Sequence, residues 1–86
     1  MLNVRLEKTT TPKVRPAESE LGFGKYLSDH VLSVDYDAEQ GWHGARVEPY
    51  HTLALDPAAA VLHYGQALFE GLKAFRQKDG AIAIFR

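Results

Sequence analysis

Cysteine is absent from this 86-residue sequence. The chain can therefore form neither disulfides nor thiolate zinc sites, and its composition fits a reducing compartment. A charge excess is lacking too, since 10 Lys and Arg stand against 11 Asp and Glu for a net charge of -1. Nucleic-acid binding usually needs a basic excess, so we expect no nucleic-acid partner.

Long apolar runs are also missing. Charged residues interrupt the N-terminal stretch MLNVRLEKTTTPKVRP every few positions, which leaves no room for the ~7–15-residue apolar core of a secretory signal. No stretch approaches the ~20 apolar residues that cross a membrane. The sequence therefore predicts a cytoplasmic protein without a membrane partner.

The chain is long enough for one small domain, although folding at this size buries only a little over ~60% of the unfolded surface. Residues 1–20 contain Pro12, Pro16 and mixed charges without a sustained period, which predicts an extended N-terminal tail. Residues 21–86 form the folded part. It ends directly after an apolar segment that nothing in the chain is left to cover, so we expect the N-terminal piece of a longer protein.

Alternation of side chains predicts the first strand, over residues 30–36, with Leu32, Val34 and Tyr36 on one face. A loop with two glycines follows over 37–44, and residues 46–50 return as a second strand. Pro49 cannot donate a ladder hydrogen bond, so it should lie at an edge or at the end of this strand.

A short helix and a hairpin are expected in the remaining residues. Asp56 suits the N-cap and Pro57 the first helical position, and Gly65 ends the helix. Residues 68–77 fit a helix or a strand, and we favour a strand because Asp79-Gly80 then forms a two-residue hairpin loop to residues 81–85. That register sets Phe75 opposite Ile84. The fold class is α+β, an antiparallel sheet with a short helix.

The same segments predict a pocket. In a strand over 68–77, Phe69, Gly71 and Lys73 share a face. Phe69 would form a wall, and Gly71 would leave room for a ligand; Tyr64 beside Gly65 repeats this pairing of an aromatic ring with free space. The alternative is that Phe69 and Tyr64 are core residues and the glycines mark a bulge and a helix cap. Composition by itself favours this alternative.

Two other groups of residues give weaker evidence of a function. Ser28-Asp29-His30 has the residue types of a catalytic triad, but neighbours in an extended chain point to opposite faces and do not converge. We expect a structural turn there. The four histidines (His30, His43, His51 and His63) match no zinc spacing, so no metal site is predicted.

Several strings resemble a known family. Leu21-Gly-Phe-Gly-Lys25, Gly41-Trp42, His63-Tyr-Gly65 and above all Leu68-Phe-Glu-Gly-Leu-Lys-Ala-Phe75 look like branched-chain amino-acid aminotransferases, pyridoxal-phosphate enzymes of fold type IV. The resemblance covers residues 21–86. It implies that these residues are part of the small N-terminal domain and that the large catalytic domain is missing.

The resemblance also implies substrate-binding residues: Phe23, Tyr64, Phe69 and Gly71 match positions that border the cavity for the branched side chain. Tyr64 is similar to a tyrosine that reaches the neighbouring subunit's site in a homodimer. The implied reaction transfers the amino group of Leu, Ile or Val to 2-oxoglutarate, so the implied partners are amino acids and 2-oxo acids.

No catalytic residue is assigned. The family's catalytic lysine, the acidic partner of the pyridine nitrogen and the phosphate arginine all match positions beyond Arg86. Lys73 is tempting, but nothing in the sequence would desolvate it. We therefore expect pyridoxal 5'-phosphate to be bound mainly by residues beyond Arg86, and the 86-residue chain to be inactive alone. The alternatives are another fold-type-IV enzyme, a D-amino-acid aminotransferase or aminodeoxychorismate lyase, or a truncated, non-catalytic interaction module.

Overall fold

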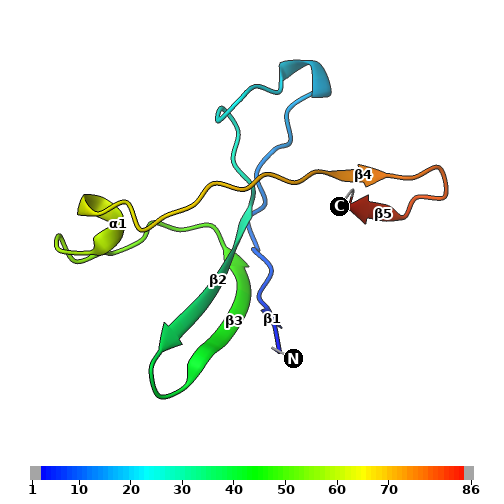
Figure 1. Cartoon of the computed structure of the whole chain (residues 1–86). Helices are drawn as coiled ribbons and strands as arrows, with labels where there is room; N and C mark the ends of the chain where they lie inside the picture. The colour runs from blue at the N-terminus through cyan, green and yellow to red at the C-terminus, as the bar shows by residue number, and fades with distance from the viewer. Residues whose placement is uncertain (1–2, 85–86) are drawn as a thin grey trace. The chain divides into compact units, whose positions relative to one another are not determined.

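The structure, a computed structural model, describes residues 3–84. It divides into two compact units, Met1–Leu53 and Ala54–Arg86, and each has its own small sheet (Figure 1). The predicted α+β class is confirmed, because the described part contains two antiparallel strand pairs, one short parallel pair and short helical turns. None of the helices in residues 3–84 is long and apolar enough to cross a membrane.

The first unit is built on an antiparallel hairpin of β2 (His30–Asp37) and β3 (Gly41–Pro49). The strand predicted over 30–36 is confirmed, but the loop predicted over 37–44 is wrong. Only three residues separate the strands, because Asp37 Oδ1 accepts hydrogen bonds from the backbone N–H groups of Glu39 and Gln40 at 2.9 and 2.7 Å. An Asp side chain that closes its own turn in this way allows the second strand to start soon after the first one ends.

A bulge interrupts this ladder. Ser33 pairs with Arg46 and Asp35 with His43, so one residue of β2 lies opposite Gly44 and Ala45 of β3. Gly44 has φ 64. A glycine in the left-handed region is the usual first residue of such a bulge, because an L side chain there is strained.

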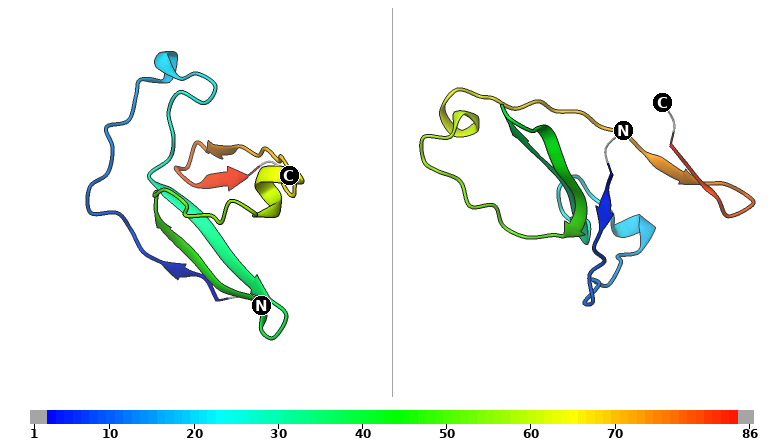
Figure 2. Two further views of the ribbon diagram at one scale, coloured as in Figure 1. Left: turned by 90° about the vertical axis from the view of Figure 1, so that its left-hand side faces the viewer. Right: turned by 90° about the horizontal axis from the view of Figure 1, so that it is seen from below.

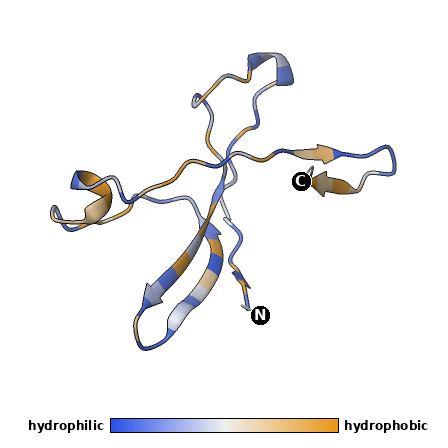
Figure 3. Cartoon of the chain, in the orientation of Figure 1, coloured by the Kyte–Doolittle hydropathy of each residue, from blue (hydrophilic) through white to orange (hydrophobic). Residues whose placement is uncertain are grey.

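The two faces of the hairpin differ in chemistry. Leu32, Val47, Tyr36 and Trp42 pair across the strands on one face, and the Tyr36 and Trp42 rings lie 5.1 Å apart. This face is largely open to solvent, and among the described residues the only buried hydrophobic one is Ala45, at 4% exposure. Figure 3 shows the apolar and polar positions alternating along β2 and β3. The sheet is therefore held mainly by its ladder and its polar face.

The N-terminal residues join the first unit at several points. β1 (Arg5–Leu6) pairs with β3 in parallel, and Glu7 N–H donates to the Val47 carbonyl at 2.8 Å. The sheet order is β1-β3-β2, and the strands are seen from two further sides in Figure 2. Glu18–Glu20 forms one 3-10 turn, η1. A domain boundary at Leu21 stays a prediction.

The second unit begins with a turn and a single helical turn, α1 (Ala60–His63). Asp56 does accept a backbone hydrogen bond, from Ala58 at 2.7 Å, but it closes a turn before the helix, and Ala59 occupies the N-cap. The helix thus starts later than predicted. Its end is as expected: Gly65 follows the C-cap Tyr64 with φ 62, a left-handed conformation typical of a helix C-terminus.

A hairpin of β4 (Ala74–Arg76) and β5 (Ile82–Ile84) completes this unit. The predicted register is wrong by one residue, since Phe75 pairs with Ala83 and Ala74 with Ile84. The loop has three residues, 78–80, closed by a hydrogen bond from Gln77 N–H to the Ala81 carbonyl at 2.7 Å. Gly80 has φ 88, the left-handed residue that three-residue hairpin loops use.

The strand predicted over 68–77 is also too long. Residues 68–73 have no regular structure, because β5 provides ladder partners only for Ala74–Arg76 within the described residues. The argument that Phe69, Gly71 and Lys73 share a strand face therefore fails. The expected strand over 81–85 is found at Ile82–Ile84. Residue 85, the last residue of the expected strand, lies outside the described part.

Candidate functional site

The four predicted substrate-binding residues are divided between the units. Phe23 belongs to the first unit, in a loop where Gly24 takes φ 70, and its side chain is 98% exposed. Tyr64, Phe69 and Gly71 belong to the second unit.

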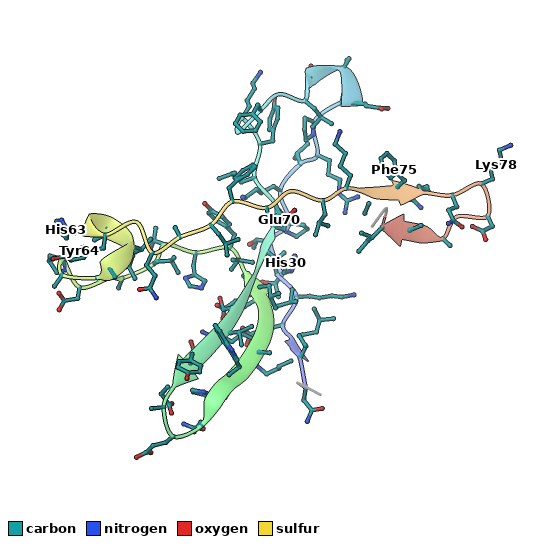
Figure 4. All side chains as sticks on the ribbon, viewed as in Figure 1. His30, His63, Tyr64, Glu70, Phe75 and Lys78 are labelled. Atoms are coloured by element: carbon teal, nitrogen blue, oxygen red, sulfur yellow. The ribbon has the colours of Figure 1, made fainter. Side chains whose placement is uncertain are left out.

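Tyr64 follows α1 directly, and Figure 4 shows it beside His63 at the end of that helix. Together with Pro57, Ala58 and His63 it lines an open hollow of about 610 Å³. Its ring is 86% exposed. Tyr64 is therefore not a core residue of this unit, and its role at a substrate pocket stays a prediction.

Gly71 lines a second open hollow of about 460 Å³ with Leu72, Lys73 and Phe75. A Cβ atom built on Gly71 would meet nothing within 4 Å. Phe69 does not line this hollow, and it is 87% exposed. Gly71 is thus exposed with open space beside it, as several other glycines of the chain are, and Phe69 does not lie at the edge of this hollow. The use of this space by a substrate stays a prediction.

Pyridoxal phosphate would need a lysine beside an acidic group and an arginine that meets the phosphate. Ion pairs among residues 3–84 involve only Arg46 and the histidines His43 and His51 as cations. Lys73 is exposed. Lys13 and Lys25 line an open hollow with Arg15 and Asp29, but Lys13 Nζ donates to the Ser28 carbonyl at 3.2 Å, and the ion pairs of the described residues include no lysine. The described residues do not by themselves fit the cofactor.

Ser28, Asp29 and His30 make separate contacts with the backbone. Ser28 Oγ donates to the His30 carbonyl at 2.6 Å, Asp29 Oδ1 accepts from Lys13 N–H at 3.1 Å, and His30 Nε2 accepts from Thr9 N–H at 3.0 Å. The Asp29 and His30 side chains tie residues 9–13 to the start of β2, whereas the Ser28 side chain bonds within residues 28–30. Within the described residues no group of three or more His, Asp or Glu side chains could hold a metal ion.

A polar network on the first sheet was missed by the sequence reasoning. Arg46 donates from Nη1 to Asp35 Oδ2 at 3.0 Å and from Nε to Glu48 Oε2 at 3.1 Å. Glu48 Oε1 also accepts from Ser33 Oγ at 3.1 Å and lies 2.8 Å from His51 Nε2. The signal was present: Ser33 and Asp35 alternate on one strand, as Arg46 and Glu48 do on the next.

The pKa values of this network move in the directions that its contacts dictate. The hydrogen bond with His51 is the main cause that lowers the pKa of Glu48 below its usual 4.5, helped by Ser33 and Arg46. The same bond is the main cause that raises the pKa of His51 above 6.5, with the Thr52 carbonyl second. The Asp35 hydrogen bond raises the pKa of Arg46. Each shift favours the charged form of its group.

The chain is similar to known proteins of one class. No family model matches the chain. A probable branched-chain-amino-acid aminotransferase of Staphylococcus aureus (strain N315) is 51% identical over 83 residues, and branched-chain-amino-acid transaminase 1 of Bacillus subtilis is 49% identical over 83; each match covers 96% of this chain. The branched-chain-amino-acid aminotransferase of Mycolicibacterium smegmatis is 53% identical over 89 residues, covering 94% of this chain. All three of these relatives are aminotransferases by name.

Their names also agree on the substrates, branched-chain amino acids. The predicted resemblance to branched-chain-amino-acid aminotransferases is therefore confirmed, at about half identity over nearly the whole chain. The chain spans only 23 to 24% of the length of these relatives. This extent is consistent with an N-terminal portion.

Proposed function

We propose that this chain is a portion of a branched-chain-amino-acid aminotransferase, which transfers the amino group of Leu, Ile or Val to 2-oxoglutarate. The observation that carries the proposal is the identity of about 50% over 96% of the chain to relatives of that name. The proposal includes pyridoxal 5'-phosphate as the cofactor, a homodimer and a cytoplasmic location.

The role of the present residues is to help form the apolar side-chain pocket. Phe23, Tyr64 and Phe69 would supply aromatic surface, and Gly71 the free space beside it. Three features support this: the exposure of the aromatic rings, the open space over Gly71 and the hollow beside Tyr64. A branched aliphatic chain has no polar handle, so each methylene it buries gives only ~1–3 kcal/mol of discrimination.

The cofactor, when bound, would supply the electron sink for the amino transfer. Because the described residues do not fit its site, no chemical step is assigned to them. We expect the 86-residue chain to show no transamination on its own, and the lysine, acid and arginine to come from the part of the longer protein that this chain does not include.

A chimera tests the proposal. The matching 83 residues of the Staphylococcus aureus relative are replaced by the corresponding residues of this chain, and transamination of leucine, isoleucine and valine with 2-oxoglutarate is measured. We expect kcat/KM within about tenfold of the parent enzyme, a tolerance of ~1.4 kcal/mol in transition-state binding.

The unmodified parent, expressed in parallel, is the matched control. A chimera that folds and binds the cofactor but prefers D-alanine, or releases an aryl amine from aminodeoxychorismate, would support the other fold-type-IV functions instead. A chimera that loses all transamination while the parent retains it would reject the proposal and favour a non-catalytic module.

A further inference from the structure

His51 lies two residues beyond the end of β3, where the chain leaves the first sheet. Its ring has two nitrogen contacts: Nδ1 lies 2.7 Å from the Thr52 carbonyl oxygen, and Nε2 lies 2.8 Å from Glu48 Oε1. Both partners can only accept hydrogen bonds, since one is a backbone carbonyl and the other a carboxylate that also accepts from Arg46 and Ser33.

This geometry selects one protonation state. Neutral imidazole has one N–H donor and one nitrogen lone pair, so one of the two contacts would set a lone pair against an oxygen lone pair. The imidazolium has two donors and satisfies both oxygens. His43 differs, because its Nε2 lies 3.5 Å from Asp37 Oδ2 and only its Nδ1 contact, to the Gly41 carbonyl at 2.9 Å, is short.

The charged state of His51 completes a row of alternating charges, Asp35, Arg46, Glu48 and His51, with neighbours joined at 3.0, 3.1 and 2.8 Å. With His51 protonated the row is neutral in sum, and with His51 neutral it carries -1. Glu48 sits in the middle with a side chain only 13% exposed. A carboxylate so placed depends on its cationic partners more than an exposed one does.

We propose that protonated His51 acts as a pH-sensitive latch that holds residues 50–52 against the end of β3. The other groups near this segment come from the N-terminal residues and the start of β2: Lys13 Nζ lies 4.8 Å from the centre of the Tyr50 ring, and the Asp29 carbonyl accepts from Tyr50 N–H at 2.9 Å. The hydrogen bonds and ion pairs of the His51 ring within the described residues go to Glu48 and Thr52 and to neither of these groups. The latch therefore rests on Glu48 and Thr52.

The direction of the pH effect follows from the two groups. The pKa of His51 is raised in the folded chain, so its contribution to stability is complete below the ordinary value near 6.5 and is lost as the pH rises through the folded value. The pKa of Glu48 is lowered, so its contribution is present above 4.5 and is lost as the pH falls through its folded value. The latch is closed between these limits.

The test is an NMR titration of the His51 ring nitrogens in the 86-residue chain, with Glu48→Gln as the variant. In the wild-type chain we expect both ring nitrogens to be protonated at pH 6.5 and the midpoint of His51 to lie above that of the same chain in urea. Glu48→Gln should shift the midpoint down and speed hydrogen exchange of the Tyr50 amide at the same pH. Contacts between Leu32 and Val47, which pair across β2 and β3, report that the sheet is formed.

The matched control is Glu39→Gln, which removes the same charge at the β2–β3 turn, where Glu39 contributes its backbone N–H to Asp37. This variant should leave the His51 midpoint where it is in the wild type. A wild-type midpoint equal to that in Glu48→Gln or in urea overturns the proposal. A wild-type sample at pH 6.5 without the β2–β3 sheet also overturns it, because the latch is claimed to close on a formed sheet.

Discussion

Replacing Gly44 with alanine is expected to weaken the β2–β3 hairpin at its bulge. Gly44 has φ 64. Holding an L residue in this left-handed region costs roughly 1–2 kcal/mol of stability. The new Cβ atom would also lie 3.3 Å from Asp35 Oδ2 and 3.6 Å from Arg46 Nη1. That contact is tight, so the Asp35–Arg46 pair must move by a few tenths of an ångström.

We therefore expect Gly44→Ala to lower the free energy of unfolding of the first unit by about 1–2 kcal/mol, chiefly through the backbone conformation. Trp42 is the one tryptophan of the chain and lies in β3 beside Tyr36. Its fluorescence during urea denaturation therefore reports on the hairpin itself.

Gly41→Ala is the matched comparison. Gly41 has φ 66, but a Cβ atom there would meet nothing within 4 Å, so this variant carries the backbone cost without the crowding. Gly44→Ala should lose at least as much stability as Gly41→Ala. If Gly44→Ala is as stable as the wild type, the left-handed bulge is not what the hairpin requires and the reasoning is refuted.

Three further outcomes can be measured. Arg46→Gln should raise the pKa of His51 further, since the charge of Arg46 lowers it; an NMR titration showing a fall would contradict the charge row. Asp79→Ala should lower the stability of the β4–β5 hairpin by about 0.5–1.5 kcal/mol, because Asp79 Oδ1 accepts from Ala81 N–H at 2.9 Å; unchanged cross-strand contacts between Phe75 and Ala83 on warming would speak against this. In the chimera, Phe69→Ala should reduce kcat/KM for leucine by about tenfold or more, a loss of ~1–3 kcal/mol of apolar contact, and an unchanged value would remove Phe69 from the pocket.

Local signals in the sequence predicted part of this structure well. The alternation of Leu32, Val34 and Tyr36 found β2, and Gly65 marked the end of α1 through its left-handed conformation. These features depend on neighbouring residues, so a sequence pattern is enough to show them. The family resemblance was likewise carried by continuous strings and is confirmed by the relatives.

Other features depend on choices that a pattern does not contain. Asp37 could close a short turn or begin a longer loop, and Asp79-Gly80 fits a loop of two residues as well as one of three. The length of β4 depends on how many of its residues find ladder partners in β5. The charge row required knowing that a bulge at Gly44 sets Arg46 opposite Ser33 and within reach of Asp35.

The candidate site shows the same division. Its residues came from matched strings and from the idea that a glycine leaves space, and the space over Gly71 is present. Its expected geometry came from a strand face, and that face does not exist at 68–73. The assignment of Phe23, Tyr64, Phe69 and Gly71 to substrate therefore stays a prediction, for the chimera to test.

The parallel pairing of Arg5 and Leu6 with Arg46 and Val47 has a consequence for the order of folding. Joining them closes a loop of about forty residues, and the entropy lost in doing so grows with loop length, whereas the β2–β3 turn closes over three residues. The hairpin should therefore form first and offer the free edge of β3 as a template. The N-terminal strand is then a late addition, which mutations or truncation can detach while the hairpin persists.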